Sequence, residues 1–171
     1  MGIENVVVAG GGVLGSQIAY QAAYKGFNVT VWLRSEGSID RAKPKFEQLR
    51  QTYVETLEAM KTDPAAYCRG LADSPELAAD QVDQLKQKAQ QAFEAIRFTT
   101  SYEQAACNAD LVIEAIAEDP AQKDAFYAEL AKYLPEQTIL VTNSSTLLPS
   151  QMAQATGRPE KFLALHFANR I

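Results

Sequence analysis

The chain has 171 residues, of which 47% are hydrophobic and 22% are charged, and its formal net charge is −5. This length fits one domain, or one and part of another, and the balance of hydrophobic and charged residues excludes a disordered tail, a collagen-like fibre and a coiled coil. The acidic balance argues against nucleic-acid binding, and no apolar run approaches the roughly 18 residues of a membrane span. The N-terminal residues do not resemble a signal peptide, and the two cysteines predict neither a disulfide framework nor a zinc site, so we expect a cytoplasmic protein without a structural metal.

The first 33 residues predict a strand, a helix and a second strand. Residues 6–9 form a short apolar run that ends in three glycines, and residues 29–33 form another. Between them, small and apolar residues recur at helical spacing over residues 13–25, and Gly26 is a suitable helix stop. A strand, helix and strand within about 30 residues form a βαβ unit, which predicts parallel strands.

Residues 40–96 interrupt this rhythm with two amphipathic helices. Apolar residues step by 3, 4, 4 and 3 positions from Phe46 to Met60, and the same steps recur from Val82 to Ile96. We therefore expect a helical hairpin inserted into the α/β domain over about residues 40–96. Pro44 is expected in the first turn of the first helix, where its missing N–H costs least.

The α/β pattern then resumes. Strands are expected at residues 96–99, 111–115, 138–142 and 161–167, and helices at residues 120–133 and 150–156. Asp119 suits the N-cap of the first of these helices, with Pro120 as its first residue. With the two N-terminal strands this makes six. The predicted fold is a Rossmann-type, doubly wound, mostly parallel α/β sheet, in one dinucleotide-binding domain spanning residues 1–171.

Gly10, Gly12 and Gly15 have the spacing G-x-G-x-x-G between the first strand and its helix. In this setting Gly10 permits a tight turn, Gly12 lets the backbone approach a pyrophosphate, and Gly15 lets the helix pack on the strand. Val13 and Leu14 open the helix, whose free N–H groups favour phosphate. The pattern predicts a dinucleotide site, and the alternative is a purely structural turn.

The end of the second strand departs from the usual fingerprint. An acidic residue that binds the adenosine ribose is expected there, but the chain carries Leu33, Arg34 and Ser35. Leu33 neither accepts a ribose hydroxyl nor repels a 2′-phosphate, whereas Arg34 and Ser35 can bind one. The cofactor is therefore expected to be NAD or NADP, with NADP favoured. The alternative is that Arg34 is a solvated loop residue and NAD binds without the acid.

Four motifs occur in a fixed order. They are the glycine run, residues 112–118 (VIEAIAE), residues 142–145 (TNSS) and residues 165–169 (LHFAN). Together they resemble the N-terminal NAD(P)-binding domain of the 3-hydroxyacyl-CoA dehydrogenase family, which includes 3-hydroxybutyryl-CoA dehydrogenases and lambda-crystallin-like proteins. The resemblance covers essentially the whole chain. It implies interconversion of (S)-3-hydroxyacyl-CoA and 3-oxoacyl-CoA with NAD or NADP, and hence an acyl-CoA substrate.

The resemblance also implies roles for single residues. His166 matches the family's general base, and Ser145 matches the serine that hydrogen-bonds the substrate oxygen. Asn143 matches the asparagine near the nicotinamide, and Glu118 and Lys123 match a pair on the cofactor side. The alternatives are structural: a half-buried strand histidine, local turn chemistry for the asparagine and serine, and a surface lysine.

Two features of the family are expected but not found before Ile171. One is a glutamate about a dozen residues after the histidine, which orients it, and the other is an α-helical C-terminal domain that completes the substrate site and forms the usual homodimer. A poorly oriented imidazole is a weak base, so we expect residues 1–171 alone to bind cofactor with little turnover. Two other readings stay open: a different Rossmann-fold hydroxyacid dehydrogenase, and a cofactor-binding module without catalysis.

Overall fold

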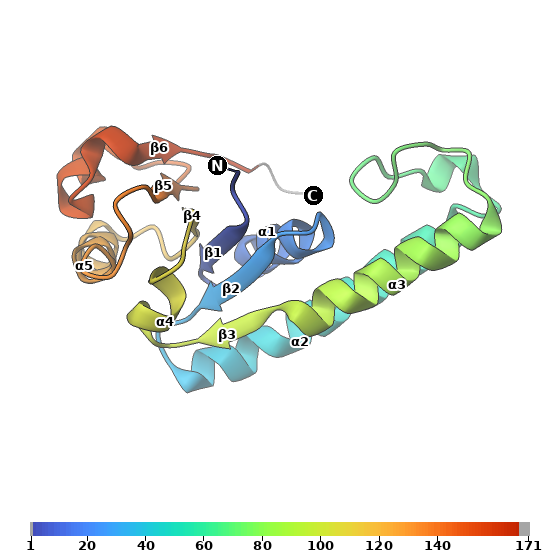
Figure 1. Ribbon diagram of the computed structural model, residues 1–171, viewed down its shortest axis with the longest axis horizontal. Coiled ribbons are helices and arrows are strands. Elements are labelled where there is room, and N and C mark those ends of the chain that lie inside the picture. The colour runs from blue at the N-terminus through green and yellow to red at the C-terminus, as the bar shows by residue number, and fades with distance from the viewer. Residues whose placement is uncertain (1, 168–171) are drawn as a thin grey trace.

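Six parallel strands form one sheet in the order β3-β2-β1-β4-β5-β6 in the computed structural model, which describes residues 2–167 (Figure 1). The strands are β1 (Asn5–Ala9), β2 (Asn28–Trp32), β3 (Arg97–Thr99), β4 (Leu111–Glu114), β5 (Ile139–Thr142) and β6 (Phe162–Ala164). The chain extends the sheet outward from β1 in one direction through β2 and β3, and then in the other through β4, β5 and β6. This reversal next to β1 confirms the predicted doubly wound topology.

Helices follow most of the strands. The α-helices are α1 (Val13–Tyr24), α2 (Glu36–Ala59), α3 (Ala79–Ala95), α4 (Tyr102–Ala106), α5 (Pro120–Leu130) and α6 (Pro149–Met152). Short 3₁₀ helices are η1 (Pro64–Ala66), η2 (Ala153–Thr156) and η3 (Pro159–Lys161). The Asp119 carboxylate accepts a hydrogen bond from the N–H of Gln122, which confirms Asp119 as the N-cap of α5.

The two faces of the sheet bury alternate residues of each strand. Val6 and Val8 of β1 pack into a hydrophobic core with α1, α2 and α3, whereas Val7 and Ala9 pack into a second core with α4, α5 and α6. Because both faces are covered, the strands are nearly continuous apolar runs rather than alternating ones. Their carboxyl ends therefore form an edge between the two helical layers, where the polar motifs of the sequence lie.

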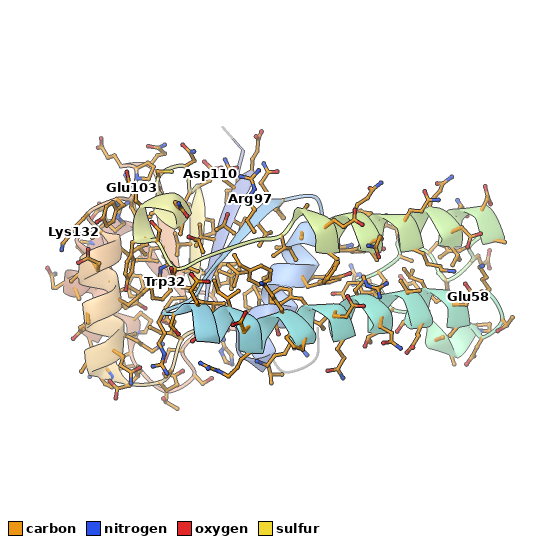
Figure 2. All side chains as sticks on the ribbon, turned by 90° about the horizontal axis from the view of Figure 1, so that it is seen from below. Trp32, Glu58, Arg97, Glu103, Asp110 and Lys132 are labelled. Atoms are coloured by element: carbon orange, nitrogen blue, oxygen red, sulfur yellow. The ribbon has the colours of Figure 1, made fainter. Side chains whose placement is uncertain are left out.

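The hairpin of α2 and α3 extends beyond the sheet. The two helices run side by side, with Glu58 near the far end of α2 and η1 in the loop at the tip (Figures 1 and 2). Two buried tyrosines of α1 fix this arm to the domain. The Tyr20 hydroxyl donates to the carbonyl oxygen of Ala89 at 2.8 Å, and the Tyr24 hydroxyl donates to that of Leu71 at 2.7 Å.

The helix α2 begins earlier than expected, and the position predicted for Pro44 is wrong. The Ser35 hydroxyl caps the helix by accepting from the N–H of Ser38, so the helix starts at Glu36, and Pro44 lies in its interior. Serine is a strong N-cap, and the buried Ala42 and Phe46 on either side of the proline anchor this stretch in the core. Tertiary packing thus overrides the helix-breaking tendency of proline.

Other boundaries differ by a few residues. The helix α4 was not predicted, α5 ends at Leu130 rather than Tyr133, and β6 ends at Ala164 rather than Phe167. After β6 the N–H of Phe167 turns to the side chain of Asn143 instead of continuing the ladder. The final residues of the LHFAN motif, 168 and 169, lie outside the described residues. Within residues 2–167, no helix combines the length and apolar character that crossing a membrane requires.

Candidate functional site

The glycine run forms a tight turn between β1 and α1. Gly10 has φ +119°, and a Cβ there would lie 2.3 Å from the carbonyl oxygen of Ala115. A Cβ at Gly15 would lie 2.3 Å from the carbonyl oxygen of Gly10. Only glycine fits these two positions, because one requires a left-handed conformation and both require close backbone approach.

Gly12 differs from Gly10 and Gly15 because no protein atom lies close to the position that its side chain would occupy. A Cβ there would meet nothing within 4 Å, and the backbone is extended, with φ −68° and ψ −174°. Gly12 is also the N-cap of α1 and provides no side-chain cap. The N-terminus of α1 therefore has no side-chain cap and has open space beside Gly12, an arrangement that suits a pyrophosphate.

A cavity of about 780 Å³ lies on the β2 side of this turn. It is lined by the glycine loop, by residues from β2 and α2, and by residues from α4, α5 and the loop after β4: Gly10, Gly11, Gly12, Trp32, Leu33, Arg34, Ser38, Arg41, Lys45, Tyr102, Ala115, Ile116, Ala117, Gln122, Ala125 and Phe126. Trp32 packs against the rings of Tyr102 and Phe126, with centroids 4.5 and 5.0 Å away. The rings are tilted by 39° and 49° to that of Trp32, and together they form an aromatic wall of the large cavity that suits an adenosine.

The three residues expected to bind the cofactor at the end of β2 lie in different environments. Leu33 is buried, with 6% of its surface exposed, and Arg34 is exposed and lines the large cavity. The Ser35 hydroxyl is engaged as the cap of α2 and does not line this cavity, whereas Ser38 does.

A second cavity, of about 220 Å³, lies on the β5 side of the same turn. It brings together seven residues singled out in the sequence: Gly12, Leu14, Gly15, Glu118, Lys123, Asn143 and Ser145. Gly12 lines both cavities, so the two spaces meet at the phosphate turn. Val13 lines neither, and its side chain is 70% exposed.

Glu118 connects the loop after β4 with the loop after β5. Its carboxylate accepts from the Ser145 N–H at 2.9 Å and from the Ser144 hydroxyl at 2.7 Å. Burial raises the pKa of Glu118, but the hydrogen bonds from Ser144 and Ser145, with Lys123 and His166 nearby, outweigh it and lower the pKa. The carboxylate is therefore held ionised, and it fixes the backbone of the loop that carries Ser145.

Lys123 is buried, so the alternative of a surface lysine is wrong. Its Nζ donates to Oε1 of Glu114 at 2.6 Å and lies 4.0 Å from Glu118. The Glu114 carboxylate also accepts from the hydroxyls of Tyr127 and Thr142, each at 2.7 Å. Burial of the Tyr127 hydroxyl beside this carboxylate raises its pKa, which keeps it a hydrogen-bond donor. Every ionic or polar group of this cluster is thus paired.

His166 is exposed and lines neither cavity. Its Nδ1 lies 3.3 Å from the carbonyl oxygen of Asn143, and the Asn143 side chain accepts from the Phe167 N–H at 2.7 Å. Asn143 therefore holds the segment that carries the histidine. Within residues 2–167, no hydrogen bond engages the Ser145 hydroxyl. The same residues contain no group of three or more histidines, cysteines, aspartates or glutamates that would hold a metal ion.

The sequence reasoning missed two sets of residues at this site. Glu114 was assigned only to a strand, although a carboxylate in the otherwise apolar run LVIEA was a usable signal. Arg41 and Lys45 were missed because the helix was expected to begin at about residue 40, which put its first turn in the wrong place. Both side chains line the large cavity.

Comparison with known proteins assigns the chain a family. A family described as "3-hydroxyacyl-CoA dehydrogenase, NAD binding domain" matches residues 5–171. The fatty acid oxidation complex subunit alpha of Pseudomonas syringae pv. syringae is 32% identical over 169 residues, which are 99% of this chain and 20% of that protein. The protein of the same name from Acinetobacter baumannii (strain SDF) is 31% identical over 172 residues, again 20% of its length. The chain thus spans about a fifth of these curated relatives.

Solved structures agree in fold. A diketoreductase, described as acting on dicarbonyl compounds, is 42% identical with a TM-score of 0.78, and the match covers 99% of this chain and 52% of that one. The 3-hydroxybutyryl-CoA dehydrogenase of Escherichia coli K12 is 28% identical with a TM-score of 0.71, over 99% of this chain and 30% of that one. These likenesses extend over the hairpin as well as the sheet.

Proposed function

The chain belongs to the 3-hydroxyacyl-CoA dehydrogenase family through its NAD-binding domain, and on that premise we propose that its protein interconverts (S)-3-hydroxyacyl-CoA and 3-oxoacyl-CoA with NAD or NADP. The observation that carries this proposal is the pair of cavities that meet at Gly12. One has an aromatic wall suited to an adenosine, and the other gathers the polar residues Glu118, Asn143 and Ser145. A dinucleotide that crosses the phosphate turn would extend its reactive end toward these polar residues.

The nucleotide fits the residues that are present. The open space at Gly12 and the uncapped first turn of α1 suit its pyrophosphate. When bound, NAD or NADP supplies the nicotinamide carbon that accepts or returns a hydride at C3 of the substrate. The protein's own residues bind and orient the two partners and move the proton.

His166 is the proposed general base. In the tautomer that carries its proton on Nδ1, the ring donates to the Asn143 carbonyl oxygen, 3.3 Å away, and leaves Nε2 as the acceptor. During oxidation Nε2 takes the proton of the 3-hydroxyl while the hydride leaves C3, and during reduction it returns that proton. Imidazole suits both directions because it can take up and return a proton near neutral pH.

Ser145 is the proposed ligand of the substrate oxygen. Its backbone N–H donates to the Glu118 carboxylate at 2.9 Å, which fixes the serine in the lining of the small cavity. With its backbone fixed in this way, the serine would donate its hydroxyl proton in a hydrogen bond to the oxygen at C3 and stabilise the negative charge that develops there during reduction. Glu118 and Asn143 act through their neighbours and are positioning residues.

The acyl-CoA substrate, the homodimer and a cytoplasmic location remain predictions, because the chain spans only about a fifth of the curated relatives. Among residues 2–167, the histidine's hydrogen-bond partner is a backbone carbonyl rather than a carboxylate. Loss of the orienting carboxylate in a comparable His-dependent site lowers kcat by roughly 10⁴-fold. We therefore propose that residues 1–171 alone bind cofactor and turn over acetoacetyl-CoA negligibly.

A chimera tests this proposal. Residues 1–171 are joined to the part of the diketoreductase that the match to this chain leaves uncovered. Oxidation of NADH and NADPH by acetoacetyl-CoA is followed by absorbance for the chimera and for residues 1–171. We expect activity only in the chimera, with a loss of about 10³-fold or more in its His166→Ala variant. Turnover by residues 1–171 at the rate of the chimera would contradict the proposed need for a second domain.

A dicarbonyl compound is the second candidate substrate. The diketoreductase shares 42% identity with this chain, more than the 28% of the 3-hydroxybutyryl-CoA dehydrogenase. The chemistry at C3 is the same for both substrates, so the distinction lies in the CoA group. In two chimeras, one with the second domain of the diketoreductase and one with that of the 3-hydroxybutyryl-CoA dehydrogenase, a higher kcat/KM for 2,4-pentanedione than for acetoacetyl-CoA in both would favour this candidate.

NADP is the proposed preferred cofactor. Leu33 replaces the acid that would repel a 2′-phosphate, and Arg34 lines the large cavity beside it. A charge-assisted hydrogen bond contributes about 1.5–3 kcal/mol. Titration calorimetry should show tighter binding of NADPH than of NADH, and Arg34→Ala should reduce the difference. Equal affinities in the unmodified chain would overturn the preference.

A further inference from the structure

Among residues 2–167, three cations line the large cavity and no carboxylate does. Arg34 follows β2, and Arg41 and Lys45 come from the first three turns of α2, one helical turn apart on the same face. The chain carries 21 acidic residues and 16 basic ones. The charged residues that line this cavity are all basic, so its charge is opposite in sign to the net charge of the protein.

The partners of these cations leave their charge uncompensated. Arg41 donates to the Ser38 hydroxyl at 2.9 Å, and Lys45 donates to the carbonyl oxygens of Gly11 and Arg41 at 3.0 and 3.3 Å. Within the described residues, none of the three forms a salt bridge. Other basic residues do so, and they include Arg50, Lys61, Lys86 and Lys132. Neutral partners orient the cations without neutralising them, which suits an anionic ligand.

The helix α2, which carries Arg41 and Lys45, packs directly on the phosphate turn. A Cβ at Gly11 would lie 2.8 Å from Cβ of Ala42 and 3.0 Å from Cδ2 of Leu33, so this glycine is required by the approach of α2. The bond from Lys45 to Gly11 puts its ammonium beside the turn. Arg41 lies one turn closer to the start of the helix, where Ser38 and Arg34 also line the cavity.

We propose that α2 supplies a two-part phosphate site to the cofactor: Lys45 binds the pyrophosphate, and Arg41, held by Ser38, joins Arg34 in binding the 2′-phosphate of NADP. This inference rests on the proposed binding of NAD(P), and it adds specificity residues from the inserted hairpin. Ser35 takes no part, because its hydroxyl caps α2 and bonds that of Ser38 at 2.9 Å.

Titration calorimetry on residues 1–171 separates the two roles. NADPH and NADH are titrated into the unmodified chain and into Arg41→Ala, Lys45→Ala and Lys43→Ala, the last being a control because Lys43 is an exposed lysine of the same helix outside the large cavity. We expect Arg41→Ala to weaken NADPH about 10- to 100-fold and to leave NADH unchanged. Lys45→Ala should weaken both cofactors alike, and Lys43→Ala neither.

Each role has its own contrary outcome. If Arg41→Ala weakens NADH as much as NADPH, or weakens neither, Arg41 does not read the 2′-phosphate. If Lys45→Ala leaves both affinities unchanged, Lys45 does not bind the pyrophosphate. Thermal unfolding of each variant checks that the fold is retained. If the affinities are as expected but the chimera is inactive, the proposed phosphate site is supported and only the proposed reaction is overturned. If the unmodified chain binds neither cofactor, the phosphate site and the proposed reaction are both overturned.

Discussion

The ammonium of Lys123 and the carboxylate of Glu114 lie 2.6 Å apart in the interior, with side-chain exposures of 1% and 0%. Glu114 ends β4 and Lys123 lies in the first turns of α5, so the pair ties the helix to the strand end. The same carboxylate accepts from the N–H of Ile116 at 2.8 Å and from Thr142 of β5. One buried charge thus fixes the three segments that carry the polar wall of the small cavity.

Removal of the buried lysine is expected to destabilise the protein strongly. Lys123→Met leaves the Glu114 carboxylate buried without its counter-ion, and loss of one partner of a buried pair costs about 3–5 kcal/mol. Urea unfolding followed by circular dichroism measures the change in the free energy of unfolding. The double variant Lys123→Met, Glu114→Gln should recover part of the loss, because it removes the buried charge.

A surface lysine provides the matched control. Lys132 pairs with Glu129, but its side chain is 62% exposed, so Lys132→Met should leave the free energy of unfolding nearly unchanged. If Lys123→Met were as mild as Lys132→Met, the buried pair would contribute little to holding the strand ends together.

Two glycines of the turn are expected to respond differently to alanine. Gly10→Ala forces a left-handed backbone on alanine and puts its Cβ 2.3 Å from the carbonyl oxygen of Ala115, so it should destabilise the fold by about 3 kcal/mol or more. Gly12→Ala meets no protein atom within 4 Å and should change stability by no more than about 0.5 kcal/mol. It should nevertheless weaken NADH and NADPH, because its methyl group occupies the path of the pyrophosphate.

Urea unfolding and titration calorimetry on the same two variants check this contrast. A Gly12→Ala protein that is stable and binds both cofactors with unchanged affinity would show that the open space at Gly12 is not where the nucleotide passes.

The sheet was predictable from sequence because its strands are apolar runs separated by turn residues, a local signal. The start of α2 was not, because two local signals compete: Pro44 favours a start just before it, whereas Ser35 caps a helix that continues through the proline. Only the packing of α2 against the sheet decides between them. That error hid Arg41 and Lys45 from the predicted site.

The role of Glu114 was beyond the sequence for a different reason. Its partners Lys123, Tyr127 and Thr142 lie 9, 13 and 28 residues further along the chain. Nothing local indicates that they converge, since their meeting point depends on how β4, α5 and β5 are arranged. A glutamate in an apolar strand therefore predicts a buried partner without naming it.

The interior proline of α2 is expected to cost stability. Pro44 lacks the N–H that would bond within the helix, and an interior proline is about 3 kcal/mol less favourable than alanine. Proline also restricts the unfolded chain, and this offsets about 0.4–1 kcal/mol of that cost. Pro44→Ala should therefore raise the free energy of unfolding by about 2 kcal/mol, which urea unfolding measures. A lower stability would mean that the proline ring makes packing contacts that outweigh the missing hydrogen bond.

The Glu118 carboxylate is expected to make stability depend on pH in the acid range. Burial alone would raise the pKa of Glu118. The hydrogen bonds from Ser144 and Ser145 outweigh burial and lower this pKa below the ordinary 4.5 in the folded protein. A lowered folded pKa stabilises the protein above the unfolded pKa, and this contribution is lost as the pH falls through the folded value. Because the side chain is 41% exposed, we expect this contribution to the free energy of unfolding to be about 1 kcal/mol at neutral pH.

Glu118→Gln should thus be less stable than the unmodified chain at about pH 7, and the difference in stability should shrink below about pH 4.5. Urea unfolding across this pH range measures the stability of both proteins as a function of pH. Asp110→Asn is the control, because the pKa of Asp110 is also lowered, but by the backbone N–H groups of Asn5 and Glu4, far from Ser145. A difference between Glu118→Gln and the unmodified chain that stays constant from neutral to acid pH would show that the Glu118 charge does not hold the loop.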